Sequence, residues 1–70
     1  MAIHVLDSVE LLKDLPEYGL QHGARGAVLQ VYGAEAVEVE FVEFTGITQA
    51  VVTLRMDEVR GVRGDDLPGA

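Results

Sequence analysis

The chain contains no cysteine, so neither a disulfide nor a thiolate metal site stabilises its 70 residues. It also lacks an apolar run long enough to cross a bilayer, and its first residues lack the basic leader of a signal peptide. These absences predict a cytoplasmic protein without structural cross-links. The hydrophobic fraction of 49% is sufficient for a globular core, which argues against disorder.

Basic residues are also scarce, because five Lys and Arg stand against twelve Asp and Glu, giving a formal charge of -7. Binding to nucleic acid depends mainly on neutralising phosphates with cations. A chain this acidic repels phosphate and anionic lipid unless its cations converge, and in sequence they are dispersed. The composition therefore predicts no nucleic-acid and no membrane partner. It suits a basic protein partner, and it also suits simple solubility.

Residues suited to catalysis are few. The histidines are His4 and His22, and the one serine, Ser8, lies outside any nucleophile-elbow context. No motif supports His22 as a base paired with Asp14 or Glu17. The acids in residues 35–43 alternate as on a solvated strand face, and no loop supplies the converging oxygens of a calcium or magnesium site. The sequence therefore predicts no enzyme, no cofactor and no metal site.

The clearest structural pattern lies in residues 36–54, AVEVEFVEFTGITQAVVTL. Its first part alternates apolar and acidic residues, as a half-buried strand does. Residues 44–46 (FTG) interrupt the pattern, and the β-branched run that follows predicts the second strand of a hairpin. The residues expected to face the core are Val37, Val39, Phe41, Ala50, Val52 and Leu54, with Glu38 and Glu40 on the opposite side.

The N-terminal half predicts two further strands around a loop. Residues 8–12 fit a strand with Val9 and Leu11 inward, although Asp7 or Ser8 could instead cap a short helix there. Residues 13–25 form a loop, in which Pro16 and Gly19 suit a turn. The apolar loop residues expected to cover one end of the core are Leu15, Tyr18 and Leu20. Residues 26–32 are expected to form a strand with Ala27, Leu29 and Val31 inside and Val28, Gln30 and Tyr32 outside.

The C-terminal part predicts one helical turn over residues 55–58 and a short last strand within residues 59–62. Five short strands, a long first loop and a helical turn before the last strand predict a mainly β fold, a small antiparallel SH3-like barrel. We expect one domain over residues 1–63 and a flexible tail over residues 64–70, which show no periodicity.

The runs VELLKDLPEYGLQHGARGAVLQVY and VEVEFVEFTGITQAVVTL resemble a bacterial family catalogued as domain of unknown function 4926. The resemblance covers about residues 8–59. Two positions depart from the family pattern, since Ala24 stands where an acid is usual and residues 43–46 lack the usual Asp-rich turn. The resemblance implies a small β-rich domain and no established activity. Its most specific parts are Leu15-Pro16-Glu17, Gly19-Leu20, Gly23, Gly26 and Val39-Glu40-Phe41.

Apolar and acidic residues occur together on the expected outer side of the sheet. Small domains rarely expose several clustered β-branched residues without a purpose, although scattered surface valines are ordinary. We therefore expect a second copy of the chain, its N-terminal segment or another protein to cover this side. The candidate interaction face consists of Val28, Glu38, Glu40, Val42, Ile47 and Val51.

These observations give three hypotheses. The first is a protein-interaction module with a basic partner, such as the acidic member of a two-gene pair, or a homo-oligomer formed through the sheet. The second is a nucleic-acid-binding barrel, which requires convergence of Arg25, Arg55, Arg60 and Arg63. The third is a metal-dependent or catalytic role through His22 and nearby carboxylates.

Overall fold

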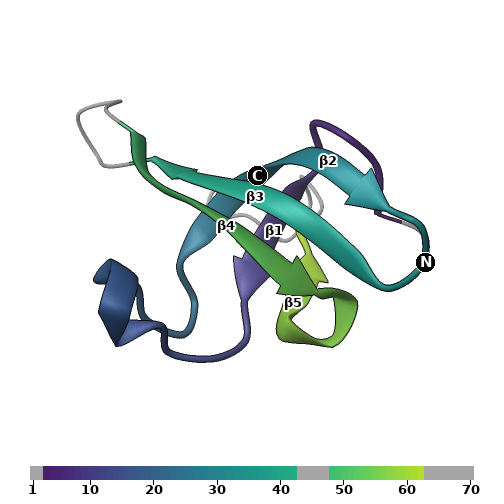
Figure 1. Cartoon of the computed structure of the whole chain (residues 1–70). Coiled ribbons are helices and arrows are strands. Elements are labelled where there is room, and N and C mark those ends of the chain that lie inside the picture. The colour runs from purple at the N-terminus through teal and green to yellow at the C-terminus, as the bar shows by residue number, and fades with distance from the viewer. Residues whose placement is uncertain (1–2, 43–47, 63–70) are drawn as a thin grey trace.

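A computed structural model of the chain describes residues 3–42 and 48–62. The hairpin turn and the tail expected from the sequence lie outside these residues. In the described part, strands and short 3-10 helices follow one another along the chain (Figure 1). Their order is β1 (Ser8–Leu11), η1 (Pro16–Tyr18), β2 (Arg25–Tyr32), β3 (Ala36–Val42), β4 (Thr48–Arg55), η2 (Met56–Glu58) and β5 (Val59–Gly61).

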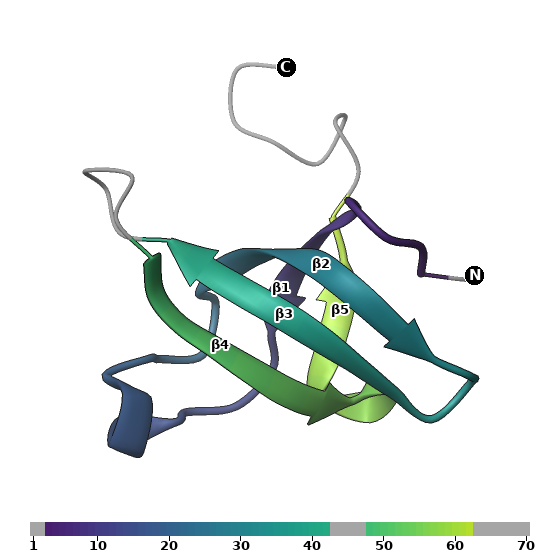
Figure 2. The same cartoon turned by 45° about the horizontal axis from the view of Figure 1, so that its top comes forward.

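All strands belong to one antiparallel five-stranded sheet in the order β4-β3-β2-β1-β5. The sheet curves so strongly that β1 and β5 lie behind β3 and β4 in both views (Figures 1 and 2). The expected closed barrel is not formed, because β4 and β5 are edge strands and no ladder between them joins the described residues. β5 has only three residues, and η2 separates it from β4. The chain therefore turns at the end of the sheet, and the described residues of β4 and β5 do not pair with each other.

The alternation in β3 and β4 sets the core as predicted. Val37 and Val39 are fully buried, and Phe41 is the largest fully buried side chain. Across the sheet, Val52 and Leu54 are also buried, and Ala50 packs against the core from a partly buried position. The full buried cluster is Val9, Leu11, Leu15, Leu20, Val28, Val37, Val39, Phe41, Val52, Leu54 and Val59.

The segment that allowed two interpretations is a strand. β1 pairs with β2 on one side and with β5 on the other, so both of its backbone edges are hydrogen-bonded within the sheet. Val9 and Leu11 are fully buried, as the strand interpretation requires. The helical alternative is wrong, because a central strand satisfies its backbone through neighbours that the local sequence does not contain.

The facing predicted for β2 is wrong in its first half. Val28 is fully buried, whereas Leu29 is 37% exposed and Ala27 lies on the outer side, paired with Glu40. The pairing with β3 shifts register between Val28 and Gln30. One extra residue, Leu29, therefore reverses the alternation, as a β-bulge does. Beyond the shift the prediction holds, since Val31 packs against the core and Gln30 and Tyr32 are exposed.

The first loop covers one end of the core through two leucines. Leu15 and Leu20 form an isolated β-bridge and are both buried, as expected. Between them η1 begins at Pro16 and ends at Tyr18, and Gly19 caps it with a φ of 70°, which suits glycine. Tyr18, which the sequence also placed over the core, is instead 44% exposed. The helical turn expected before the last strand is η2, and β5 follows it directly.

We expect Phe41→Ala to lower the free energy of unfolding by about 3–5 kcal/mol, because it removes a buried ring and leaves a cavity. Val42→Ala is the matched control, since Val42 is the next residue and its side chain points to solvent. Urea denaturation followed by circular dichroism measures both. A loss in Phe41→Ala no larger than that in Val42→Ala would contradict the placement of Phe41.

Gly26→Ala should also destabilise the fold, by about 1–3 kcal/mol, because the added methyl group overpacks the core. A Cβ atom at Gly26 would lie 2.7 Å from the Glu40 carbonyl oxygen, which is backbone and cannot rotate away. Gly61→Ala is the control, because a Cβ atom there meets nothing within 4 Å. Thermal unfolding of the two variants should differ clearly, and equal melting temperatures would show that β2 and β3 do not approach so closely.

Candidate functional site

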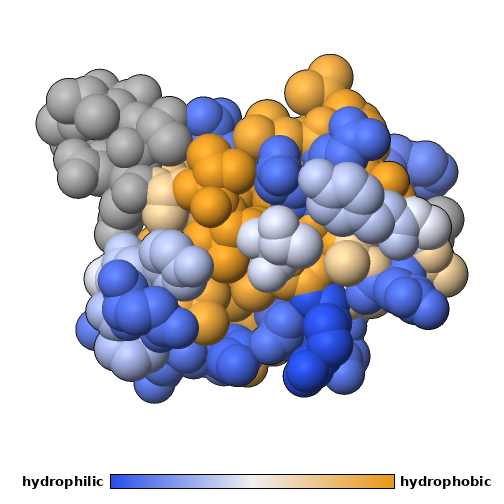
Figure 3. Space-filling view, viewed as in Figure 1, coloured by the Kyte–Doolittle hydropathy of each residue, from blue (hydrophilic) through white to orange (hydrophobic). Residues whose placement is uncertain are grey.

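The surface of β3 and β4 opposite the core carries acidic and apolar side chains together; we call it the outer face. It consists of Glu38, Glu40 and Val42 of β3 and Val51 and Thr53 of β4. Glu40 lies opposite Val51, and Glu38 lies opposite Thr53. Val42 and Val51 are 44% and 48% exposed. Figure 3 shows an apolar area over these strands, bordered by polar side chains.

The structure brings together four residues of the predicted interaction face: Glu38, Glu40, Val42 and Val51. Val28 does not belong to it, because the register shift in β2 turns this side chain into the core. Ile47 lies outside the described residues. Sequence reasoning omitted Thr53, although the alternation of β4 points it to the same side as Val51.

Tyr32 extends the outer face onto β2. Its hydroxyl donates a hydrogen bond to Oε1 of Glu38 at 3.2 Å. Partial desolvation of the phenol, together with the negative charge of Glu38, raises the pKa of the Tyr32 hydroxyl above its ordinary value. Tyr32 therefore stays a neutral donor at physiological pH and holds the Glu38 carboxylate at the surface.

The outer face continues into an open depression of about 270 Å³ beside β1. Ser8, Ala27 and Glu40 form one row across three strands, because Ser8 pairs with Ala27 and Ala27 pairs with Glu40. Arg25 and Val42 complete most of the rim. This depression offers small and apolar groups flanked by one acid and one base.

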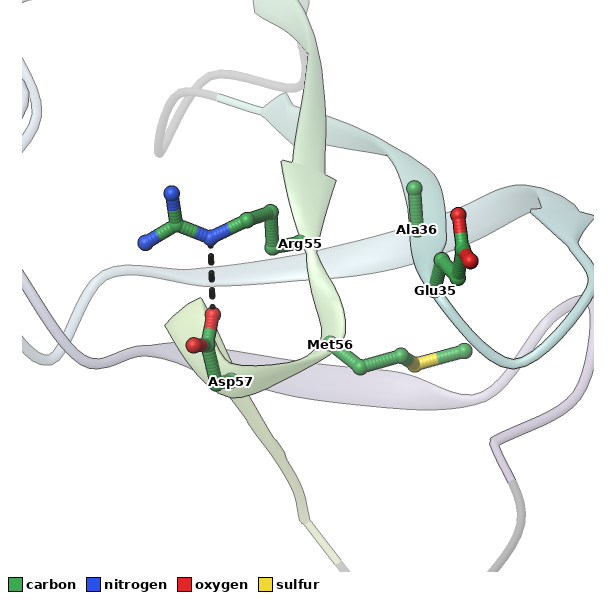
Figure 4. Close-up of a pocket in the computed structure, with 5 residues that line it drawn as sticks. All are labelled: Glu35, Ala36, Arg55, Met56 and Asp57. Carbon is green, nitrogen blue, oxygen red and sulfur yellow. Dashed lines mark hydrogen bonds and ion pairs between the residues drawn. The ribbon is translucent and has the colours of Figure 1, made fainter.

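A second, larger depression of about 480 Å³ lies at the end of β4. Figure 4 shows that the Arg55 guanidinium points toward Asp57 and away from Glu35. Nε of Arg55 donates to Oδ1 of Asp57 at 3.1 Å, so an opposite charge already satisfies this cation. Ala36 and Met56 are its other lining residues, so no Ser, Cys or His side chain lines the depression.

Every Lys and Arg within residues 3–42 and 48–62 lies close to a carboxylate. Lys13 is 3.1 Å from Glu58, and Arg55 pairs with Asp57. Arg25 and Arg60 share one oxygen of Glu10, at 3.9 Å and 3.4 Å. Of the four arginines considered for nucleic acid, only Arg25 and Arg60 are brought together, Arg55 is held at η2, and Arg63 lies outside the described residues. Each described cation thus has an acid beside it, although Arg25 and Arg60 share a single carboxylate.

His22, considered above as a base, lies beside Asp14 in the first loop. The backbone N–H of His22 donates to Oδ1 of Asp14 at 2.8 Å, so the contact between these residues uses the main chain of His22. Within residues 3–42 and 48–62, no three His, Asp or Glu side chains are grouped so as to hold a metal ion. No helix in that part of the chain is long and apolar enough to span a membrane.

Comparison with known proteins agrees with the resemblance noted in the sequence. The family model described as Domain of unknown function (DUF4926) matches residues 5–61, which include every strand of the sheet. The chain belongs to this family. Among curated proteins and among solved structures, no significant match to the chain is found.

Sequence reasoning missed the carboxylate that ties the end of this DUF4926 domain together. Oε1 of Glu58 accepts a hydrogen bond from the backbone N–H of Arg55 at 2.8 Å, and Oε2 faces Nζ of Lys13 at 3.1 Å. The Glu58 carbonyl also accepts from the N–H of Leu12 at 2.9 Å. One residue thus joins the end of β4 to the segment after β1. The signal was present only locally, as an acid three residues after Arg55 at the start of a helical turn.

The hydrogen bond from Arg55 lowers the pKa of the Glu58 carboxyl below its ordinary value of 4.5, with burial opposing the shift and Lys13 adding to it. A lowered pKa in the folded state means that the ionised carboxylate stabilises the fold. This contribution is complete above about pH 4.5, the unfolded value, and is lost as the pH falls through the lower folded pKa.

Glu58→Gln should therefore lower the free energy of unfolding at pH 7 by about 1 kcal/mol, because the amide still accepts the N–H of Arg55 but the charge that strengthens this bond is removed. The difference from the parent should shrink as the pH falls below about 4.5, where the parent carboxylate also becomes protonated. Asp57→Asn is the control, because the side chain of this neighbour is 75% exposed and pairs with the Arg55 side chain at the surface. Denaturant titrations at several pH values provide the test, and a difference that does not depend on pH would contradict the role of the charge.

Proposed function

We propose that this DUF4926 domain is a protein-interaction module that binds a basic polypeptide through the outer face. The observation that supports this best is the composition of that face. Two valines, each nearly half exposed, share it with Glu38 and Glu40. An apolar centre with a charged rim is the usual division of an interface, in which the apolar part limits dissociation and the charges guide association.

The charge distribution supports a basic partner. The formal charge of the whole chain is -7. Each described cation lies within ion-pairing distance of an acid, and twelve acidic residues against five basic ones leave the chain with a large excess of negative charge. A cationic partner therefore gains in association rate, whereas phosphate backbones are repelled. For this reason the nucleic-acid alternative has little support. The domain suits the acidic member of a two-gene pair.

The strand order supports the finer assignment of the fold as SH3-like. In β4-β3-β2-β1-β5, the central strand β2 pairs with β3 on one side and β1 on the other, and a 3-10 helix precedes the last strand. This order fits a small SH3-like barrel left open between β4 and β5. Such barrels have no fixed activity, so the functional argument rests on the outer face alone.

The experiment that tests this function uses the tagged full chain as bait in a lysate of its native cells, with captured proteins identified by mass spectrometry. We expect a basic protein that is retained by the parent and lost with Val51→Asp, because the new charge would be desolvated at the apolar centre. Val5→Asp is the matched control: Val5 is 50% exposed but lies outside the outer face. Circular dichroism checks that both variants fold.

A second pair of variants separates the local charges from the total charge. Glu38→Lys with Glu40→Lys should slow association with the captured partner about tenfold and change dissociation little. Glu17→Lys with Glu35→Lys makes the same change in net charge on exposed residues outside the outer face. Equal effects of the two pairs on the association rate, or capture by Val51→Asp as strong as by the parent, would show that the outer face is not the binding surface.

A further inference from the structure

β4 is a long edge strand without the usual protection. It spans Thr48–Arg55, eight residues, whereas the opposite edge strand β5 has only three. Natural proteins protect exposed edges by making them short or by placing proline or charge along them. Residues 48–54, TQAVVTL, contain neither proline nor a charged residue. The sheet therefore ends in a strand suited to pairing with another chain.

The hydrogen-bond register shows which backbone groups face this free edge. The N–H of Met56 donates to the carbonyl oxygen of Glu35 at 2.8 Å. Hydrogen-bonded pairs recur at every second residue of an antiparallel ladder, so Leu54, Val52 and Ala50 also direct their backbone groups to β3. The residues between them, Val51 and Thr53, direct theirs away from the sheet.

The stretch of β4 whose backbone groups point away from β3 is limited at both of its ends. Arg55 is the next residue of β4 whose backbone groups point away from β3. Its N–H donates a hydrogen bond to Oε1 of Glu58. Toward the start of β4, the pairing with β3 shifts register between Phe41 and Val42, which bends an edge locally. Within residues 3–42 and 48–62, Val51 and Thr53 thus direct two N–H and two C=O groups away from β3, and no other described strand pairs with them.

Side chains define what an added strand would meet. The side chains of Val51 and Thr53 belong to the outer face, with Glu40 and Glu38 behind them on β3. An added strand would lie about 4.8 Å beyond β4, so its outer-side residues would be about 10 Å from those acids, within reach of lysine or arginine side chains. On the other side, the added strand would continue the apolar row of Val52 and Leu54, which are buried in the core.

We infer that the free edge of β4 binds an extended segment of a basic protein as an additional antiparallel strand, with Lys or Arg alternating with apolar residues. The inference rests on the proposed function and specifies its binding mode. A second copy of the chain fits this edge poorly, because each copy carries a formal charge of -7 and would bring its own Glu38 and Glu40 to the same side. Backbone pairing would supply the affinity, and the alternating cations would supply the specificity.

The direct test uses a synthetic nine-residue peptide of alternating Lys and Val, blocked at both termini, titrated into the full chain. Amide hydrogen exchange measured by NMR reports on single residues. We expect the peptide to protect the amides of Val51 and Thr53 from exchange and to leave those of Ala50 and Val52 unchanged, since the latter already bond to β3. The same peptide with Glu in place of Lys should not bind.

Backbone methylation of the peptide separates strand addition from simple charge attraction. In an antiparallel pair, two residues that are hydrogen-bonded directly opposite each other have their side chains on the same side of the sheet. The peptide residues that bond to the backbone of Val51 and Thr53 therefore have their side chains on the outer face, and in the proposed orientation these residues are the lysines. N-methylation of the Lys amides should weaken binding at least about tenfold, whereas N-methylation of the Val amides should not. Thr53→Pro, which removes one outward N–H from a strand edge, should weaken binding of the unmodified peptide similarly if circular dichroism shows a native fold.

The outcomes distinguish the binding mode from the proposed function. Absence of protection at Val51 and Thr53, or binding that survives methylation of the Lys amides, would overturn strand addition. If Val51→Asp still abolishes capture of the native partner in that case, the proposed function stands and the partner binds the outer face in another way. A dimer in sedimentation that Thr53→Pro dissociates would also overturn the inference, because a second copy would then occupy the edge.

Discussion

The close approach of β2 to β3 at Gly26 is the constraint on which the rest of the structure depends. Gly26 lies between Val9 of β1 and Phe41 of β3, and no side chain larger than hydrogen fits there. The Cβ position of Gly26 would be 3.0 Å from Cδ1 of Phe41, so the ring occupies the space that the glycine leaves. Phe41 can therefore be fully buried where three strands meet, and β2 can serve both halves of the curved sheet.

This arrangement also explains where sequence reasoning succeeded. In β3, strict alternation correctly assigned Val37, Val39 and Phe41 to the core. Both of its ladders contain a register shift, but the extra residue lies in β2 or in β4, so β3 itself keeps a period of two. The same rule failed in β2, because the extra residue at Leu29 reverses the facing, and no residue in GAVLQVY marks it. Since Val28 was assigned to the wrong side, the predicted interaction face lost one member while its acidic residues and the valines of β3 and β4 remained.

The closure of the sheet into a barrel was predicted less well than the positions of the strands, for a related reason. Hairpins and alternation are local, whereas pairing between β4 and β5 depends on how far the whole sheet curves and on the length of each edge. Glu58 decides this end of the fold, since its carboxylate accepts the N–H of Arg55 and its carbonyl accepts the N–H of Leu12. Both contacts hold the chain in a tight turn after β4, and β5 then pairs with β1 instead of returning to β4.

The same carboxylate connects the fold to the candidate site. Because Glu58 accepts the N–H of Arg55, this backbone group of β4 is not available to a partner. Val51 and Thr53 are the other residues of β4 whose backbone groups point away from β3. Those residues are also the β4 contribution to the outer face, so the backbone groups and the side chains available to a partner lie on one short stretch. A sequence pattern shows that Val51 and Thr53 face the same side, but it cannot show which backbone groups the sheet leaves unpaired. That follows only from the register, which the hydrogen bond from Met56 to Glu35 establishes from Arg55 back to Ala50, where the pairing shifts.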